Sequence, residues 1–342
     1  MISVYIQQKK DNERHIPLLN PNLGIRKKPN RLFSTESQYC GPKLFRIVSE
    51  PNEADYLLIP HNFFDIAKDA VYVDDCVQMS VRMNKKVLIF DFSDFDWDIS
   101  VPNSVVFRYS QYGYKKKDNE YIVPPFAEDL GDHHGVVFRE KGPTPLVGFV
   151  GWAGHLTLKS RVVYVLKNLF AGIASLWSFH SHLHRQGIYF RRKALRLLGH
   201  TKEVMLHATV RNSYSAHTDT IALSPEQARK EYIENIQTSD LCLAPKGDGN
   251  FSLRFYEILS LGRIPLLIDT DMCLPMSDSI PYDDFILRVS SRDIQKLPQI
   301  VKDFWGRTSK ESYIQMQKKA RYHFSEFLAP EVFYQKLFEK VL

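Results

Sequence analysis

Residues 238–278 read TSDLCLAPKGDGNFSLRFYEILSLGRIPLLIDTDMCLPMSD, and the order of elements in these residues indicates the class of fold. Two apolar runs, Leu241–Ala244 and Ile264–Asp269, have the composition of strands that are buried on both faces of a parallel sheet. Between them lie a loop with two glycines and an amphipathic segment, Ser252–Leu261, which begins at a good helix-capping residue. The order strand, loop, helix, strand is the repeating unit of an open α/β sheet.

The same alternation extends in both directions along the chain. Ala54–Pro60 and Lys86–Asp91 read as buried strands, and Leu146–Gly151 opens a second series that continues with a helical segment from Lys159 to about Ala171. The stretch 127–145 is polar and rich in turn-forming residues, which indicates a linker. We therefore predict an α/β protein of two Rossmann-like lobes with parallel sheets. The predicted divisions are 1–140, 141–310 and a helical segment at 311–342 that could pack back on the first lobe.

Composition limits the class of protein. The chain has 342 residues, of which 44% are hydrophobic, so large cores are expected. The net charge of +6 is dispersed and accompanies no nucleic-acid reading motif, so we expect no nucleic-acid partner. The 4 cysteines form no CxxC pair, and no apolar run approaches the length that spans a bilayer. The first residues turn polar without a signal-peptide core.

The loop after the run Leu241–Ala244 has the features of a phosphate-binding loop. It follows the carboxyl end of a parallel strand, which is the edge where open α/β sheets bind ligands. Gly247 and Gly249 allow the backbone to approach a ligand closely. Ser252 is a plausible N-cap, and the amino end of the helix that follows attracts anions.

Arg254 and Glu257 are three residues apart and share one face of this helix. A guanidinium group here can bind a phosphate in a forked geometry, and a carboxylate one turn on can accept hydrogen bonds from the vicinal hydroxyls of a ribose. Lys246 can add a positive charge. A surface ion pair on an ordinary helix would leave the same spacing, so that alternative stays open.

The segment resembles the hallmark motif of the exostosin-like glycosyltransferases (GT47-type). The matching positions are Ser239, Cys242, Leu243, Pro245, Gly247, Ser252, Arg254, Glu257, Gly262, Ile264, Pro265, Asp271, Leu274 and Pro275. Arg263 stands where that family usually has cysteine. The likeness is strong in the second lobe and thin in the first, where Ala54-Asp55-Tyr56 and Phe95-Asp96-Trp97 give fainter matches.

This resemblance implies the GT-B architecture, in which two Rossmann-like lobes face each other across a cleft. It also implies an inverting glycosyltransferase, of the hexosyl- or glycuronosyl-transferring kind. Such an enzyme moves a sugar from a nucleotide-sugar donor to a glycan or other hydroxyl acceptor, as in polysaccharide biosynthesis or protein glycosylation. The donor would lie on Arg254 and Glu257 of the second lobe. The alternative is an inactive protein of the same fold that still binds nucleotide or glycan.

Inversion by direct displacement needs a general base for the acceptor hydroxyl. Asp96, Asp94 and His61 follow strands of the first lobe, and Asp96 is the first choice because it occupies the family's H-D-W position, although Phe95 replaces the histidine. Taken singly, each fits a turn-capping carboxylate or a surface histidine better than a base. On the donor side, Gly151 is expected in a loop against the diphosphate and Arg161 on the helix that follows it.

We expect no cofactor and no metal. Asp269-Thr270-Asp271 has the form of a metal-binding DxD sequence, but it follows the last core strand, where the exostosin motif itself has an aspartate. Relatives of this type often carry a membrane anchor, and this chain shows none. We therefore expect a cytoplasmic enzyme of a bacterium or virus, or a Golgi-type lumenal domain from which an anchor has been removed.

Overall fold

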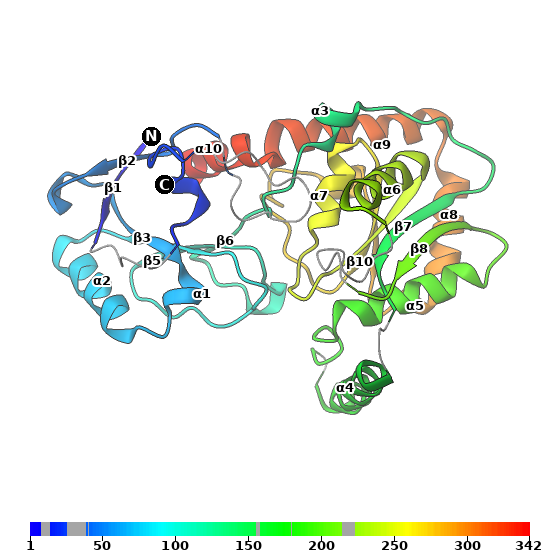
Figure 1. Ribbon diagram of the computed structural model, residues 1–342, viewed down its shortest axis with the longest axis horizontal. Coiled ribbons are helices and arrows are strands. Elements are labelled where there is room, and N and C mark those ends of the chain that lie inside the picture. Colours follow the sequence, from blue (N-terminus) through cyan, green and yellow to red (C-terminus); the bar gives the residue numbers. More distant parts are fainter. Residues whose placement is uncertain (8–13, 26–38, 40, 155–157, 179, 214–222) are drawn as a thin grey trace.

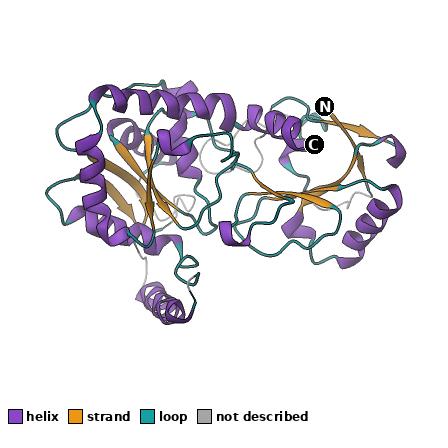
Figure 2. Ribbon diagram, turned by 180° about the vertical axis from the view of Figure 1, so that it is seen from behind, coloured by secondary structure: helices purple, strands orange, loops and turns teal. Residues whose placement is uncertain are grey.

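The computed structural model describes residues 1–7, 14–25, 39, 41–154, 158–178, 180–213 and 223–342. Two parallel sheets form two lobes that lie side by side (Figure 1). This confirms the predicted α/β class with two Rossmann-like lobes. Helices cover both faces of the second sheet, as Figure 2 shows most clearly.

The first sheet has six strands in the order β2-β1-β3-β4-β5-β6. Its strands are β1 (Ile2–Ile6), β2 (Phe45–Val48), β3 (Tyr56–Asn62), β4 (Val87–Asp91), β5 (Ser104–Arg108) and β6 (Glu120–Ile122). The helices of this part are α1 (Phe63–Ile66), α2 (Ala70–Met83) and α3 (Leu130–His134). Every residue of β4 and β5 is buried, because central parallel strands are covered on both faces.

The second sheet has five strands in the order β11-β10-β9-β7-β8. They are β7 (Leu146–Trp152), β8 (Met205–Arg211), β9 (Leu241–Pro245), β10 (Ile264–Asp269) and β11 (Leu287–Ser290). The helices are α4 (Leu158–Trp177), α5 (Gly187–Gly199), α6 (Pro225–Thr238), α7 (Leu253–Ser260), α8 (Leu297–Arg307) and α9 (Lys310–His323). Chain order along the sheet reverses between β7 and β9, as in a doubly wound fold.

Local sequence explains where the helices of the second lobe begin. Helix α6 starts at a complete capping box, in which the Ser224 hydroxyl accepts from the Gln227 backbone and the Gln227 side chain accepts from the Ser224 backbone. Pro225 occupies the first helical turn, where its missing N–H costs nothing. Ser252 is the N-cap residue of α7, although its side chain makes no capping bond.

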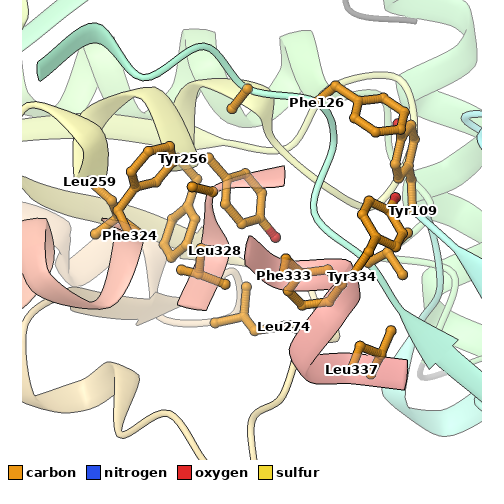
Figure 3. Packing of buried hydrophobic residues seen from close by; sticks show 14 of the residues in the cluster. Tyr109, Phe126, Tyr256, Leu259, Leu274, Phe324, Leu328, Phe333, Tyr334 and Leu337 are labelled. Atoms are coloured by element: carbon orange, nitrogen blue, oxygen red, sulfur yellow. The ribbon is translucent and has the colours of Figure 1, made fainter. Parts of the chain in front are cut away.

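A continuous apolar core joins the lobes. After α9, a π-helical turn (Phe324–Leu328) leads to α10 (Pro330–Val341), which lies against the first lobe (Figure 1). The Phe338 ring is 5.4 Å from that of Phe107 and 5.7 Å from that of Phe45. Figure 3 shows the middle of this core, where Tyr334 of α10 lies beside Phe126, with ring centroids 5.9 Å apart, and Leu337 lies further along the helix. The apolar contacts of α10 therefore hold the C-terminal segment on the first sheet.

The stretch expected as a linker is partly structured. It contains α3, and within it Leu130 and Gly131 are buried. The Leu130 N–H donates to the Ser260 hydroxyl at 3.2 Å, and a side chain at position 131 would collide with the Ser260 carbonyl. This stretch is therefore packed against α7 instead of forming a free tether.

Candidate active site

The candidate site lies where the order of the second sheet reverses. Strands β7 and β9 pair only at Val147–Leu241 and Gly148–Cys242, near their amino ends. Beyond those pairs no ladder joins them, so their carboxyl ends are free to diverge. In open α/β sheets, ligands bind outside the carboxyl ends of strands at such a switch point. The predicted donor residues Gly151, Lys246 and Gly247 lie at the ends of these two strands.

Arg254 reaches the carboxyl end of β7. Its guanidinium donates to the Val150 carbonyl and lies over two rings, 4.6 Å from the centroid of Phe149 and 4.8 Å from that of Tyr232. Such stacking holds a planar cation in place without neutralising it. Among the described residues, Arg254 forms no ion pair with a carboxylate. A positive group thus remains for an anion at the switch point.

Gly151 provides the space for this guanidinium. A Cβ atom at position 151 would lie 2.7 Å from Nη2 of Arg254, closer than carbon and nitrogen can pack. The glycine is therefore required by the position of Arg254. These two predicted residues, about a hundred positions apart in the chain, are brought together by the fold.

Glu257 points toward α6, where it is bound on both oxygens. Its carboxylate accepts from the Arg229 guanidinium at 2.9 Å and from the Tyr232 hydroxyl at 2.5 Å, and it is 6% exposed. Arg229 also pairs with Glu128 at 2.9 Å. Arg254 and Glu257 share Tyr232 as a neighbour but do not pair with each other, so the simple surface ion pair is wrong. A carboxylate has about four acceptor positions, so Glu257 retains capacity for a hydroxyl.

Lys246 is buried at the boundary between the lobes. Its ammonium donates to the Tyr112 hydroxyl at 2.8 Å and to the Leu183 carbonyl at 2.9 Å, and the residue is 2% exposed. Burial lowers the pKa of Lys246 to about 8, against the opposing effect of Asp96 and Asp248. The side chain thus joins the lobes, and an expected role at the diphosphate stays a prediction.

The glycine loop packs on the first lobe. The Gly249 N–H donates to the Asp94 carboxylate at 3.3 Å, and a Cβ at position 249 would lie 2.7 Å from the Asp94 carbonyl oxygen. Next to it, buried Asn250 donates to the Gln111 carbonyl at 3.1 Å and accepts from the Thr270 hydroxyl at 2.6 Å. The glycines therefore permit close contact between lobes, in addition to any contact with a ligand.

The three predicted bases occupy different environments. Asp94 is exposed on one side, while partial burial under the glycine loop, together with Asp248, raises its pKa. Burial also acts to raise the pKa of Asp96, but the Lys115 ammonium at 2.5 Å outweighs it and holds this pKa below its usual range. His61 is fully buried and stacks on His15, so an acceptor does not reach it in this conformation.

Beside Asp96 lies a cluster of aromatic and histidine side chains. None of them was singled out from the sequence as a candidate base. The Tyr114 hydroxyl is 2.5 Å from Nε2 of His184, and the Tyr114 ring stacks on His180 with centroids 3.7 Å apart. Nδ1 of His184 is 3.9 Å from the Asp96 carboxylate, and burial lowers the pKa of His184. A nearby cavity of about 340 Å³ is lined by Tyr114, His180, Asp271 and others.

Asp269 and Asp271 have protein partners. Asp269 accepts from the Met272 N–H at 2.9 Å and pairs with Arg288, while Asp271 accepts from the Tyr114 N–H at 3.0 Å. These contacts are those of turn-forming and lobe-joining carboxylates. The described part of the chain holds no group of three or more candidate metal ligands.

Two further features lie away from the switch point. Arg161 is exposed on α4, which projects from the second lobe (Figure 1). A cavity of about 720 Å³ lies between β11, α8 and α9 and includes Arg288, Phe304 and Met316. It contains none of the predicted site residues.

The second lobe is similar in sequence to a known protein family. The family model of the exostosin GT47 domain matches residues 175–304. This confirms the predicted exostosin resemblance over that part of the chain, which includes β8 to β11 and helix α7.

Curated relatives match over short segments. A rice (Oryza sativa subsp. japonica) protein named "Probable glucuronosyltransferase" is 39% identical over 70 residues, which are 20% of this chain and 17% of the relative. The exostosin-1 homolog of Caenorhabditis elegans is 30% identical over 103 residues, 30% of this chain and 26% of the relative. The "Probable beta-1,4-xylosyltransferase IRX10" of Arabidopsis thaliana is 34% identical over 70 residues, 20% of this chain and 17% of the relative. The match therefore spans about a quarter or less of these relatives' own length.

Among solved structures, Staphylococcus aureus TarM is similar in part. A mutant in complex with Fondaparinux, alpha-GlcNAc-glycerol and UDP aligns with a TM-score of 0.39 at 9% identity, covering 83% of this chain and 54% of that chain.

Proposed function

We propose that this chain is an inverting glycosyltransferase that moves a sugar from a nucleotide-sugar donor to a hydroxyl of a glycan. The observation that carries the proposal is the placement of Arg254 at the switch point. Its guanidinium is held by Val150 and two rings, and no carboxylate of the described residues neutralises it. A leaving nucleoside diphosphate needs such fixed positive charge. The exostosin GT47 match and the names of the curated relatives support the same class of reaction.

In this proposal the donor diphosphate binds Arg254 beside Gly151. Glu257 accepts from the ribose hydroxyls with its remaining acceptor capacity, while Arg229 and Tyr232 keep it in position. Ser252 contributes its backbone N–H at the start of α7, while Gly247, whose N–H donates to the Phe251 carbonyl at 2.8 Å, shapes the loop beside the donor. Lys246 acts through its charge from behind the loop, because its ammonium is already bound by protein oxygens. No metal takes part.

For the base we propose one of the two aspartates, and the structure favours Asp94 over Asp96. A general base works best when its pKa lies near the working pH. The pKa of Asp94 is raised, whereas that of Asp96 is lowered by Lys115. Asp94 also touches the glycine loop, so it lies at the boundary between the acceptor and donor lobes.

The test has two stages. A thermal-shift screen with UDP, GDP, ADP and CMP identifies the nucleotide that raises the unfolding temperature, since a ligand of the native state stabilises it by mass action. Sugar nucleotides of that base are then incubated with glycan acceptors, and NMR of the product reports the configuration at the anomeric carbon. Absence of stabilisation by all four nucleotides would overturn the proposal, and a retained configuration would overturn the inverting mechanism.

A second candidate is a protein that binds nucleotide or glycan without turnover. The observation that favours it is the ion pair of Asp96 with Lys115, together with Phe95 in place of the usual histidine. Donor hydrolysis by the purified protein decides between the two. Turnover that is lost in Asp94→Asn, with nucleotide binding retained, supports the enzyme, whereas nucleotide binding without any hydrolysis or transfer supports the second candidate.

A further inference from the structure

Helix α4 shows its apolar face to solvent. The apolar residues Val162, Val165, Leu166, Leu169, Phe170 and Ile173 recur at the spacing of one helix face. Their side chains are 47% to 68% exposed, and Phe170 is the most exposed of them. Both ribbon views show the helix standing away from the body of the second lobe (Figures 1 and 2).

The opposite face of α4 is turned to the protein. Tyr164, Asn168 and Gly172 are half-buried there. The Arg192 guanidinium of α5 lies 5.5 Å from the Tyr164 ring centroid, and a Cβ at Gly172 would be 3.1 Å from Nη2 of Arg185. An ordinary surface helix buries its apolar face and exposes its polar one. The described apolar side chains of α4 are instead turned outward, so a further apolar phase is needed to cover them.

The stretch of sequence that contains α4 carries charge of one sign. Residues 141–202 contain ten Lys or Arg and no Asp or Glu, while the whole chain has a net charge of +6. The rest of the chain therefore carries a net charge of −4. Lys159 lies exposed in the first turn of α4, and Arg196 lies exposed on α5. Within the described ranges, neither residue forms a salt bridge.

We propose that α4 is an interfacial helix that docks this protein on an anionic lipid bilayer. A helix with a broad apolar face and a basic surround lies in the membrane surface, with its apolar side chains at the boundary between headgroups and acyl chains. Lysine and arginine near that surface are attracted to anionic lipids. A bilayer supplies both an apolar layer and negative charge over a wide area. No helix of the described chain is long and apolar enough to cross the bilayer, so α4 lies on it.

Docking through α4 places the candidate site near the lipid surface. Strand β7 ends at Trp152, and α4 begins at Leu158, six residues further on. Gly151, at the end of β7, contacts the side chain that we assign to the donor. The arrangement suits an acceptor that is itself held at a membrane, and this part of the inference rests on the proposed function.

Vesicle flotation tests the lipid docking by itself. The full chain is mixed with vesicles of phosphatidylcholine alone or of equal parts phosphatidylcholine and phosphatidylserine. We expect flotation only with the anionic vesicles, and we expect it to fall as salt is added because charged contacts are screened. Lys159→Gln with Arg196→Gln weakens the binding to anionic vesicles. Absence of binding to either vesicle overturns the proposal.

A matched pair of variants isolates the apolar face. Leu169→Glu with Phe170→Glu places two charges on the exposed face of α4, and we expect about a tenfold or greater loss of vesicle binding. Val71→Glu with Val81→Glu makes the same change at two exposed positions of α2, which are 73% and 67% exposed, and leaves binding unchanged. Equal binding by both double variants overturns the proposal.

Two readouts separate the proposal from its rivals. Light scattering after gel filtration reports whether the wild type is a dimer that the α4 variant dissociates. That result, without vesicle binding, assigns the face to a second copy and overturns the lipid proposal. Thermal unfolding confirms that all variants keep the wild-type fold, as expected for exposed side chains. Because flotation needs no nucleotide, it succeeds or fails independently of the glycosyltransferase assay.

Discussion

Gly151→Ala should weaken nucleotide binding by moving Arg254. The new Cβ would lie 2.7 Å from Nη2, whereas an ordinary contact is about 3.4 Å or longer, so the guanidinium must shift by several tenths of an ångström or more. The shift would loosen its hydrogen bond to Val150 and its stacking on Phe149. The displaced group is the end of a flexible side chain, but Gly151 also has a φ of +157°, which alanine rarely adopts, so Gly151→Ala should lower the unfolding temperature as well.

The size of the effect follows from the contact that is lost. A hydrogen bond to a charged group contributes about 1.5–3 kcal/mol, so Arg254→Ala should raise the Kd for a nucleoside diphosphate roughly ten- to hundredfold. Gly151→Ala should lose part of that free energy, which corresponds to about a tenfold rise in Kd. In the Arg254→Ala background, Gly151→Ala should weaken binding less than in the wild type, because the group that it displaces is gone and only the backbone strain at the positive φ of position 151 remains.

Isothermal titration calorimetry on the four proteins of this double-mutant cycle measures the coupling. The nucleotide is whichever of UDP, GDP or ADP stabilises the wild type most. Gly306→Ala is the matched control, since a Cβ at Gly306 meets no atom within 4 Å. The reasoning is refuted if Gly151→Ala weakens binding equally with and without Arg254, or if Arg254→Ala leaves the Kd unchanged.

Three other predictions concern the lobe boundary and the ribose contact. The pKa of Lys246 is about 8 in the folded chain and 10.5 in the unfolded chain, so the unfolded state holds more protons between these values, and stability should rise with pH across that window. Lys246→Met should lack this rise in unfolding free energy. If urea unfolding gives the same pH dependence for the two proteins, the prediction is contradicted. Asn250→Ala removes several buried hydrogen bonds of the side-chain amide and should cost about 2–4 kcal/mol in unfolding free energy, whereas Ser110→Ala, which removes the single bond that the Ser110 hydroxyl accepts from the Asn250 backbone N–H, should cost about 1 kcal/mol; equal losses would refute this. Glu257→Gln breaks the ion pair with Arg229 and should lower the unfolding temperature, and it should weaken binding of a nucleoside diphosphate more than that of inorganic pyrophosphate; equal weakening of both ligands would remove the ribose role.

The choice between Asp94 and Asp96 turns on partners that lie far apart in sequence. Lys115 pairs with Asp96 across 19 positions, and the glycine loop covers Asp94 across 155 positions. Sequence resemblance favoured Asp96 because of its position before Trp97. The charges and burial in the folded chain favour Asp94 as the base, and kcat profiles of Asp94→Asn and Asp96→Asn against pH would compare them.

Local features of the sequence were enough to predict the second lobe. The apolar runs that become β9 and β10 are buried throughout, apart from the last residue of β10, and the caps at Ser224 and Ser252 mark the starts of α6 and α7. These features could be predicted because strand burial and helix capping depend on residues within a few positions of each other. The motif also singled out Arg254 and Glu257.

The contacts of those side chains follow from the folded chain and could not be read from the motif. Glu257 is bound by Arg229 of α6, Lys246 is buried against Tyr112 of the other lobe, and Gly151 makes room for Arg254. The outward apolar face of α4 is likewise visible only once the neighbours of the helix are known. Periodicity tells which residues share a face, but which partner meets that face depends on the packing of elements that are distant in the chain. Charge, burial and pKa follow from that packing, and so does the chemistry of the site.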